Sequence, residues 1–599
     1  MKLGAILLVV ALPVVATLPA HAQNRTWINP LDLDYRYNFE QTRQGISYRT
    51  SADPVIVPYG TGEYYLFATL VDGYWRSTNL RDWTHVTPTR WPAEDIVAPA
   101  ARAVGDTIVL LQSMTTSRPL YYTTSPANGK LDFYHRWFPP PPGAQTPFGL
   151  QTPGPDSIPP GPWDPDLFRD PDTGRWYMYW GSSNYYPLFA AEIDPATRTV
   201  YRDSVIRLFG LDPARHGWER FGPDHTDPRD PYIEGAWMTK YDGRYYLQYG
   251  APGTEYNVYA NGTYVADDPL GPFVYAPYNP ISYKPGGFMT GAGHGNTFLD
   301  HHGNYWNTGT GWVGINWNFE RRIVMYPAGF DEDGQMYANT RFGDFPHHVP
   351  TSKWEGSNDL FTGWMLLSYR RPASASSVRD TFPAGNVTDE NPRTYWLAQT
   401  ASANEWLSVD LGSMHTVRAV QVNYVDHESG IFLNDSTVYT TFRLEHSPDG
   451  MTWQPLAHVG YDQRRDRPNA YVELPGPVRT RFVRYVHDHV ASPNLAISDL
   501  RVFGAGDGAA PATPQRLRVR RDGDPRNAFV RWDAVPGAVG YNVLWGIAPD
   551  RLYQTWQWWA DAGSQLEVRA LTIGQEYWFA IEAFNENGVS DVSEPVHLP

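Results

Sequence analysis

The chain has 599 residues and a formal net charge of −16, which argues against DNA, RNA or an acidic membrane as its partner. It contains no cysteine, so disulfides, thiolate metal sites and a thiol nucleophile are excluded. Aromatic residues make up 15% of the chain, which favours a β-rich fold and also allows some rings to stack on a ligand.

The first 22 residues have the pattern of a secretory signal peptide. Lys2 supplies the positive charge, residues 3–15 the apolar stretch and residues 20–22 the small-residue cleavage pattern. No later apolar run is long enough to span a bilayer. We therefore expect an exported protein, secreted or periplasmic, with no membrane insertion.

Residues 23–370 contain a repeated unit. Five units of short aromatic and β-branched runs are separated by Gly, Pro, Asp and Asn turns. Three of them place an acid, Asp53, Asp164 or Glu234, shortly before an aromatic strand, and the fifth begins with His294 between two glycines. A period of roughly 45–70 residues with several strands per unit is propeller-like. The pattern predicts an all-β chain that starts with a five-bladed β-propeller, whose acids meet at the axis.

Two smaller domains follow the repeats. Residues 371–505 come after a Ala/Ser-rich linker, and their alternating strands predict a β-sandwich. Residues 511–599 follow a Gly/Ala/Pro linker and carry Tyr577 in a pattern that suits the tyrosine corner of an immunoglobulin-like sandwich. We expect this last domain to be a spacer.

Four short motifs, one per unit and in order, resemble glycoside hydrolase family 43, the family of five-bladed arabinofuranosidases and β-xylosidases. They are Ala52-Asp53-Pro54, Asp164-Pro165-Asp166-Leu167-Phe168, Ile233-Glu234-Gly235 and Gly293-His294-Gly295. Residues 371–505 resemble a discoidin-like (F5/8 type C) jelly-roll module of the galactose-binding type, and residues 511–599 resemble a fibronectin type III domain.

The resemblance implies that Asp53 is the general base, Glu234 the general acid and Asp164 the residue that orients the acid and raises its pKa. Asp166 competes with Asp164 for that last role. An inverting enzyme needs a water between base and sugar, so the two working carboxyl groups should stand about 6.5–9.5 Å apart. A third carboxylate beside Glu234 would keep it protonated near neutral pH.

The resemblance also implies further contacts. His294 would lie beside a calcium or sodium ion at the axis, through water, and no organic cofactor is expected. An arginine of the last blade, Arg321 or Arg322, would face the site, and the sequence does not decide between them; Arg321 is taken as the substrate-binding residue.

Three tryptophans close to the motifs, Trp75, Trp163 and Trp237, are candidates for stacking on a sugar, and core packing explains each of them at least as well. Loop aromatics and arginines of the discoidin-like module could bind sugar, or the module could be purely structural.

Together these features predict a monomeric, inverting exo-glycosidase that removes a terminal pentose, α-L-arabinofuranose, from plant cell-wall polysaccharide. A β-xylosidase, an exo-β-galactosidase on arabinogalactan and an endo-arabinanase remain open, and the long insertion at 139–165 favours a closed pocket. From other classes, a non-catalytic glycan-binding propeller and an adhesion protein built on the C-terminal modules also remain open.

Overall fold

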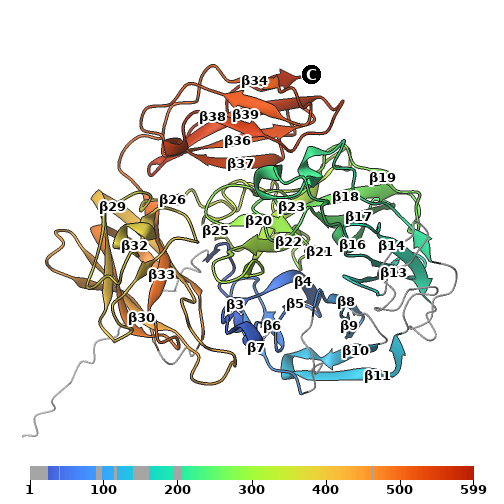
Figure 1. The fold of residues 1–599 in the computed structure, drawn as a ribbon, viewed down its shortest axis with the longest axis horizontal. Coiled ribbons are helices and arrows are strands. Elements are labelled where there is room, and N and C mark those ends of the chain that lie inside the picture. The colour runs from blue at the N-terminus through green and yellow to red at the C-terminus, as the bar shows by residue number, and fades with distance from the viewer. Residues whose placement is uncertain are drawn as a thin grey trace, which may run out of the picture.

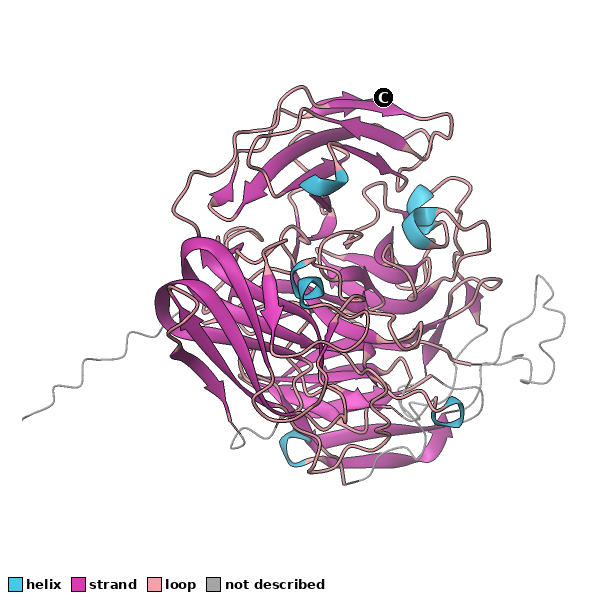
Figure 2. Cartoon of the chain, turned by 60° about the vertical axis from the view of Figure 1, so that its left-hand side comes forward, coloured by secondary structure: helices cyan, strands magenta, loops and turns pink. Residues whose placement is uncertain are grey.

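The computed structural model describes residues 25–38, 41–89, 97–113, 118–138, 161–193, 205–460 and 465–599 (Figure 1). These residues form β-strands and short 3-10 helices without an α-helix, which confirms the all-β prediction (Figure 2). Within them, no helix is long and apolar enough to cross a membrane. The signal-like residues 1–22 and residues 139–160 of the Pro-rich insertion lie outside these ranges.

Five antiparallel sheets follow one another between residues 52 and 338; neighbours in sequence are paired in the first four, and in the fifth both β20 and β21 pair with β22. The first holds β4 (Ala52–Tyr59), β5 (Glu63–Thr69), β6 (Tyr74–Ser77) and β7 (Thr84–Val86). The second holds β8 (Ala100–Val104), β9 (Thr107–Leu111), β10 (Arg118–Ser125) and β11 (Lys130–Phe138). The third holds β12 (Asp166–Arg169), β13 (Trp176–Trp180), β14 (Phe189–Ile193) and β15 (Ile206–Arg207).

The fourth sheet holds β16 (Glu234–Tyr241), β17 (Arg244–Ala251), β18 (Ala260–Ala266) and β19 (Val274–Tyr275). The fifth holds β20 (Thr290–Gly293), β21 (Thr297–Leu299), β22 (Tyr305–Trp312), β23 (Arg321–Phe330) and β24 (Met336–Ala338).

The five sheets close a ring through their first strands. β4 contacts β8, β8 contacts β12, β12 contacts β16, β16 contacts β21, and β22 of the fifth sheet returns to β4. Figure 1 shows β4, β8, β16 and β21 gathered around one centre, with β7, β11 and β19 farther out. Side chains at the axial ends of these inner strands therefore converge.

The next part of the chain is one eight-stranded sheet. Its strands are β26 (Met365–Leu366), β27 (Ala373–Ala375), β28 (Trp396–Leu397), β29 (Trp406–Tyr424), β30 (Thr441–Ser447), β31 (Gln454–Val459), β32 (Asn469–His489) and β33 (Ala496–Ala505). The long strands β29 and β32 pair along most of their length and enclose a separate apolar core that includes Trp396, Val420 and Ile497.

The C-terminal part is a sandwich of two sheets. One has β34 (Arg518–Arg521), β35 (Ala528–Arg531) and β38 (Gln565–Val568); the other has β36 (Gly540–Gly546), β37 (Gln554–Trp559), β39 (Tyr577–Asn585), β40 (Gly588–Val589) and β41 (Val596–Leu598). The Tyr577 hydroxyl accepts a hydrogen bond of 3.0 Å from the backbone N–H of Thr572, as a tyrosine corner requires.

The three parts share their apolar cores. The core of the C-terminal sandwich, around Trp545 and Phe579, is continuous with that of the third and fourth ring sheets around Trp218 and Tyr249. A second cluster joins all three parts, with Phe345 of the ring segment against Phe503 and Phe584. The C-terminal sandwich is thus packed against the ring, and the spacer prediction is wrong.

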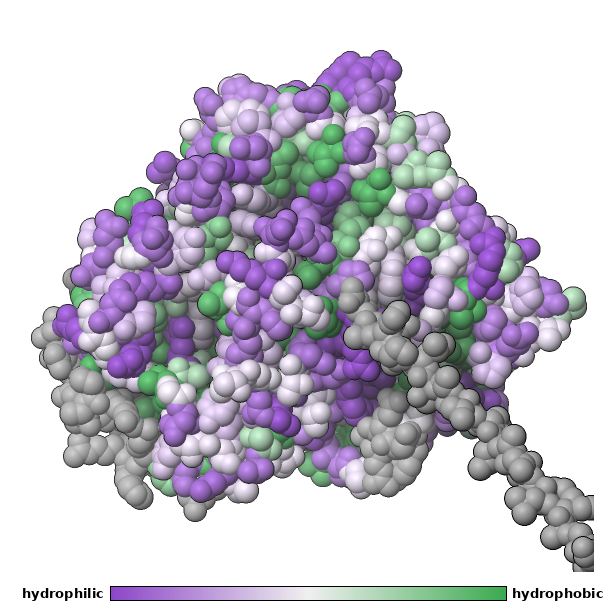
Figure 3. Space-filling model, turned by 180° about the vertical axis from the view of Figure 1, so that it is seen from behind, coloured by the Kyte–Doolittle hydropathy of each residue, from purple (hydrophilic) through white to green (hydrophobic). Residues whose placement is uncertain are grey.

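Buried charge also crosses from the ring to the eight-stranded sheet. The guanidinium of Arg49 lies 2.6 Å from Asp426 and 2.7 Å from Asp466, and none of the three side chains is more than 6% exposed. Arg467 pairs with Asp32 in the same interface. The outer surface is different: hydrophilic residues cover most of the face in Figure 3, with small hydrophobic groups between them.

Candidate active site

In each sheet one residue stands in the left-handed backbone region within two residues of an end of the first strand. These residues are Asp53, Ala98, Asp164, Gly235 and His294, with φ of 52°, 42°, 46°, 65° and 45°. Register shifts interrupt the pairing at Asp53, Glu234 and His294, or directly beside them, and such bulges re-aim side chains. The ring therefore turns these side chains toward its axis.

Glycine is required in the fourth sheet. A Cβ at Gly235 would lie 2.6 Å from the imidazole carbons of His294, which is closer than such atoms can approach. The acid of the fourth sheet is accordingly the preceding residue, Glu234, which begins β16.

Asp53 lies among positive and hydrogen-bonding groups. Its carboxylate accepts a hydrogen bond of 2.6 Å from the Thr69 hydroxyl and lies 3.3 Å from His294 Nδ1. The guanidinium of Arg321 is 3.9 Å away. The backbone N–H of Asp53 donates to Thr310 Oγ1 at 2.9 Å. These contacts fix the orientation of the Asp53 carboxylate.

Asp164 and Glu234 form the other side of the cluster. His294 Nδ1 is 3.8 Å from Asp164, and ligand atoms of Asp164, Glu234 and His294 all lie within 4.8 Å of one another. Ser113 donates to Asp164 at 3.0 Å. Ser182 donates to Glu234 Oε2 at 3.1 Å, and the Tyr259 hydroxyl donates to Oε1 of the same side chain.

Burial and charge hold a proton in this cluster. Burial raises the pKa of Asp164 from 3.8 to about 7; the negative charges of Glu234 and Asp53 add to the rise, while His294 opposes it. For His294, burial lowers the pKa, but the carboxylates of Asp53, Asp164 and Glu234 outweigh burial and the net shift is upward. The axis thus combines a carboxyl group and an imidazole whose pKa values are both raised by their surroundings.

Of the two candidate arginines, Arg321 faces the site: its guanidinium donates to Thr254 at 3.2 Å and approaches Asp53. Arg322 is 2% exposed and bonds to Asn469 of the eight-stranded sheet. Of the two neighbouring aspartates, Asp164 points to the axis.

Asp166 is fully buried in a bidentate pair with Arg102 at 3.0 and 2.7 Å. Its second oxygen also accepts the Met238 N–H at 2.8 Å. Its carboxylate therefore serves the packing of the third sheet on the fourth and does not compete with Asp164.

Two of the three predicted sugar-stacking tryptophans lie elsewhere. Trp75 is 0% exposed and packs between Tyr35 and His85, so a ligand cannot reach its ring. Trp237 is 5% exposed, with the Arg102 guanidinium 3.6 Å from its ring centroid. These two predictions are wrong, because each ring fills the core; Trp163, beside Asp164, is half-buried and stays a candidate.

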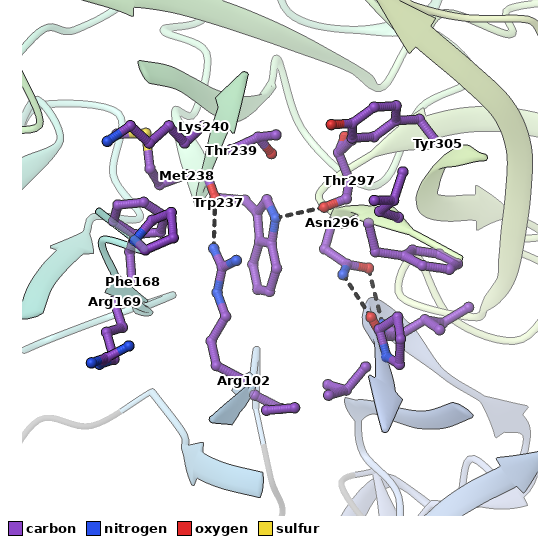
Figure 4. Close-up of a pocket in the computed structure, with 18 residues that line it drawn as sticks. Arg102, Phe168, Arg169, Trp237, Met238, Thr239, Lys240, Asn296, Thr297 and Tyr305 are labelled. Atoms are coloured by element: carbon purple, nitrogen blue, oxygen red, sulfur yellow. Dashed lines mark hydrogen bonds between the residues drawn. The ribbon is translucent and has the colours of Figure 1, made fainter. Parts of the chain in front are cut away.

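Trp237 lines a separate cavity of about 380 Å³, together with Arg102, Asn296 and Lys240 (Figure 4). Figure 4 shows its indole N–H directed to the Thr297 carbonyl, a bond of 3.0 Å. None of Asp53, Asp164 and Glu234 is among the residues that line this cavity.

Several hydroxyls of the site were missed by the sequence argument. Thr69, Ser113, Ser182 and Thr310 each lie at or just after the second long strand of a sheet and bond to an acid at the axis, three of them across to the next sheet. Thr69 also accepts the N–H of Ala98 at 2.7 Å. A Ser or Thr at this place in four of the five units was the signal that could have found them.

The residues around His294 do not form a direct calcium shell. Calcium takes six to eight oxygen ligands. The metal-compatible group in the part of the chain that the structure describes offers two carboxylates and one imidazole, and His294 Nδ1 is turned toward Asp53 and Asp164. An ion held through water stays a prediction.

Two family models match the chain. Residues 43–336 match the model described as Glycosyl hydrolases family 43, and residues 372–497 match the F5/8 type C domain. No curated protein matches the chain.

Among solved structures, a glycoside hydrolase is 20% identical over 76% of this chain and 97% of its own, with a TM-score of 0.43. A xylan β-1,4-xylosidase from Bacillus halodurans C-125 is 12% identical over 96% of each chain, with a TM-score of 0.39. An exo-1,5-α-L-arabinanase from a bovine ruminal metagenomic library is 18% identical over 49% of this chain and 97% of its own, with a TM-score of 0.36.

The family match settles the class of protein and sets aside the non-catalytic alternative. Residues 43–336 are a glycosyl hydrolase family 43 domain, an F5/8 type C domain follows it, and the chain is a glycoside hydrolase that acts with inversion.

Proposed function

We propose that the five sheets are the blades of a five-bladed β-propeller and that the protein is an exported, monomeric exo-glycosidase. It removes a terminal pentose, α-L-arabinofuranose, from plant cell-wall polysaccharide. The observation that carries this proposal is the convergence of Asp53, Asp164 and Glu234 on one axis with His294 and Arg321 between and beside them. The C-terminal sandwich is proposed to be a fibronectin type III domain.

In the proposed mechanism, Asp53 is the base. Its carboxylate takes a proton from the attacking water, while the Thr69 hydroxyl, His294 and Arg321 fix its position. Glu234, held by Ser182 and Tyr259, gives a proton to the leaving oxygen. Asp164 lies close enough to share that proton and to return Glu234 to its acidic form. No step uses a metal.

We expect pentose release from a branched arabinan and from p-nitrophenyl α-L-arabinofuranoside, with the product first appearing as the inverted anomer. The measurement is a substrate panel with proton NMR of the first product. If the aryl β-xyloside or β-galactoside is hydrolysed faster than the α-L-arabinofuranoside, the substrate is the corresponding sugar instead. Retention of configuration would contradict the roles given to Asp53 and Glu234.

The pH dependence follows from Asp164. Because its pKa is raised to about 7, the Asp164–Glu234 pair keeps a proton at acidic pH and loses it as pH rises through about 7. We expect kcat/KM on polysaccharide to fall above that pH. Asp164→Asn should shift the pH at which this alkaline fall occurs. The same raised pKa makes the unfolded chain lose this proton first, so the contribution of Asp164 to stability declines from about pH 4 to pH 7. If the alkaline fall of kcat/KM occurs at the same pH in Asp164→Asn as in the wild type, the titrating proton belongs to another group.

A further inference from the structure

A cleft of about 580 Å³ lies where the three parts of the chain meet. The ring domain lines it with residues around 223–224, 257, 285–290 and 312, the F5/8 type C domain with 389–393, and the C-terminal sandwich with 556–559. Because no one domain forms this space, its shape depends on the shared cores that fix the domains together.

Two strands in the wall of the cleft also carry, or lead to, residues of the acid cluster. Trp312, in its wall, lies two residues beyond Thr310 on β22, which is about 7 Å along a strand. Thr310 accepts the N–H of Asp53, and Trp312 is the register partner of Arg321. Thr290, also in the wall, begins the strand β20 that leads directly to His294.

The lining has the chemistry of a sugar-binding surface. Three half-buried tryptophans, Trp312, Trp558 and Trp559, line the cleft. The Arg393 guanidinium lies over the Trp312 ring and Trp559 is stacked on Tyr369, so Trp558 is the ring best placed to pack against the C–H bonds of a sugar. Asn391 brings an amide group that can bond to hydroxyls, whereas the Asn257 amide N–H groups already donate to Asp224 and to the Pro285 carbonyl. Apolar faces with a few convergent polar groups are typical of ligand sites.

Arg393 of the F5/8 type C domain is the central feature of this lining. Its guanidinium lies 4.3 Å from the ring centroid of Trp312 in the ring domain. Among the residues that the structure describes, no carboxylate lies within ion-pair distance of Arg393, and the side chain is exposed. Its guanidinium therefore lines the cleft without an acid among the described residues to pair with it.

We propose that this cleft binds the polysaccharide chain from which the terminal sugar is released, and that Arg393 and Trp558 are substrate-binding residues supplied by the accessory domains. The proposal rests on the proposed function, and it makes the substrate a polymer held by all three domains. A short aryl glycoside reaches the acids without filling the cleft, whereas a polymer occupies both.

The test compares polymer with small substrate in Arg393→Ala. We expect the ratio of kcat/KM on arabinan to kcat/KM on the aryl glycoside to fall about tenfold, as expected for losing hydrogen bonds from a charged donor. The matched control is Arg484→Ala in the same domain, whose guanidinium lies 3.9 Å from Trp453 outside the cleft. Arg484→Ala should keep the wild-type ratio of kcat/KM on arabinan to kcat/KM on the aryl glycoside. Trp558→Ala, like Arg393→Ala, should lower this ratio.

A binding experiment separates this proposal from the catalytic one. In the inactive Glu234→Gln background, affinity electrophoresis in gels containing arabinan or arabinoxylan should show weaker retardation after Arg393→Ala, with an unchanged melting temperature. An unchanged ratio, an equal fall on both substrates, or unchanged retardation would overturn the cleft proposal. Failure of the wild type to release sugar from any substrate would instead overturn the proposed function, and the retardation would still report on the cleft.

Discussion

Glu234→Gln should lower kcat/KM on polysaccharide by about 10²–10⁴-fold, the usual contribution of a positioned general acid. The amide keeps the hydrogen-bonding shape of the side chain beside Ser182 and Tyr259 but has no proton to give to the leaving oxygen. The loss should be much smaller on p-nitrophenyl glycosides, because nitrophenolate leaves without help. Initial rates on both substrates, measured on the same preparations, give the two numbers.

Glu255 provides the matched control for this variant. It is a second half-buried carboxyl near Glu234, and its pKa is raised by burial and by the charge of Glu234. It makes no contact with Asp164 or His294 comparable to that of Glu234. Glu255→Gln should therefore cost far less on polysaccharide and show no preference for the aryl leaving group. An equal loss in the two variants would mean that the acid has been assigned to the wrong residue.

Arg49→Ala should destabilise the whole protein by about 3–5 kcal/mol, the cost of removing one partner from a buried ion pair. The substitution leaves Asp426 and Asp466 buried at the interface between ring and F5/8 type C domain without their cation. Arg49 also begins β3 (Arg49–Thr50), which leads into the strand of Asp53, so activity should fall with stability. Urea unfolding followed by tryptophan fluorescence measures the change.

Arg479→Ala is the control for the ion pair. Arg479 pairs with Asp507, but both side chains are 54% exposed, and such surface pairs contribute about 0–1 kcal/mol. The two arginine variants therefore differ in burial and not in chemistry. Equal shifts in the urea midpoint would show that the domain interface contributes little to stability.

The same interface changes how a truncation should be interpreted. The adhesion hypothesis predicts that deleting residues 372–599 abolishes the main activity. Deletion would expose Phe345 and the ring residues around Trp218 that now pack against the removed domains. Loss of activity would follow from that exposure under any hypothesis, so point variants such as Arg393→Ala are the better test.

The sequence predicted the strands and the axial residues because both depend on local pattern. Alternating aromatic and β-branched runs define the strands, and an acid followed by Pro or Gly marks the bulge that turns its side chain inward, as at Asp53, Asp164 and Glu234. Each signal lies within a few residues, so it could be found without knowing how the sheets are arranged.

The errors have a physical reason as well. Trp75 and Trp237 are near the motifs in sequence, but a strand alternates its side chains between two faces and moves away from the axis by more than 3 Å per residue. The role of the C-terminal sandwich depends on contacts between residues hundreds of positions apart, such as Trp218 with the core around Trp545. No local pattern encodes such contacts.

The left-handed backbone at Asp53, Asp164 and His294 has a consequence for how this enzyme could be improved. Each such residue costs roughly 1–2 kcal/mol relative to glycine, which adopts that conformation freely. Selection for heat resistance alone would therefore favour glycine at the three places where turnover needs a functional group. Stabilising substitutions are best sought in the outer strands of the sheets, with the residues at the axis of the ring left unchanged.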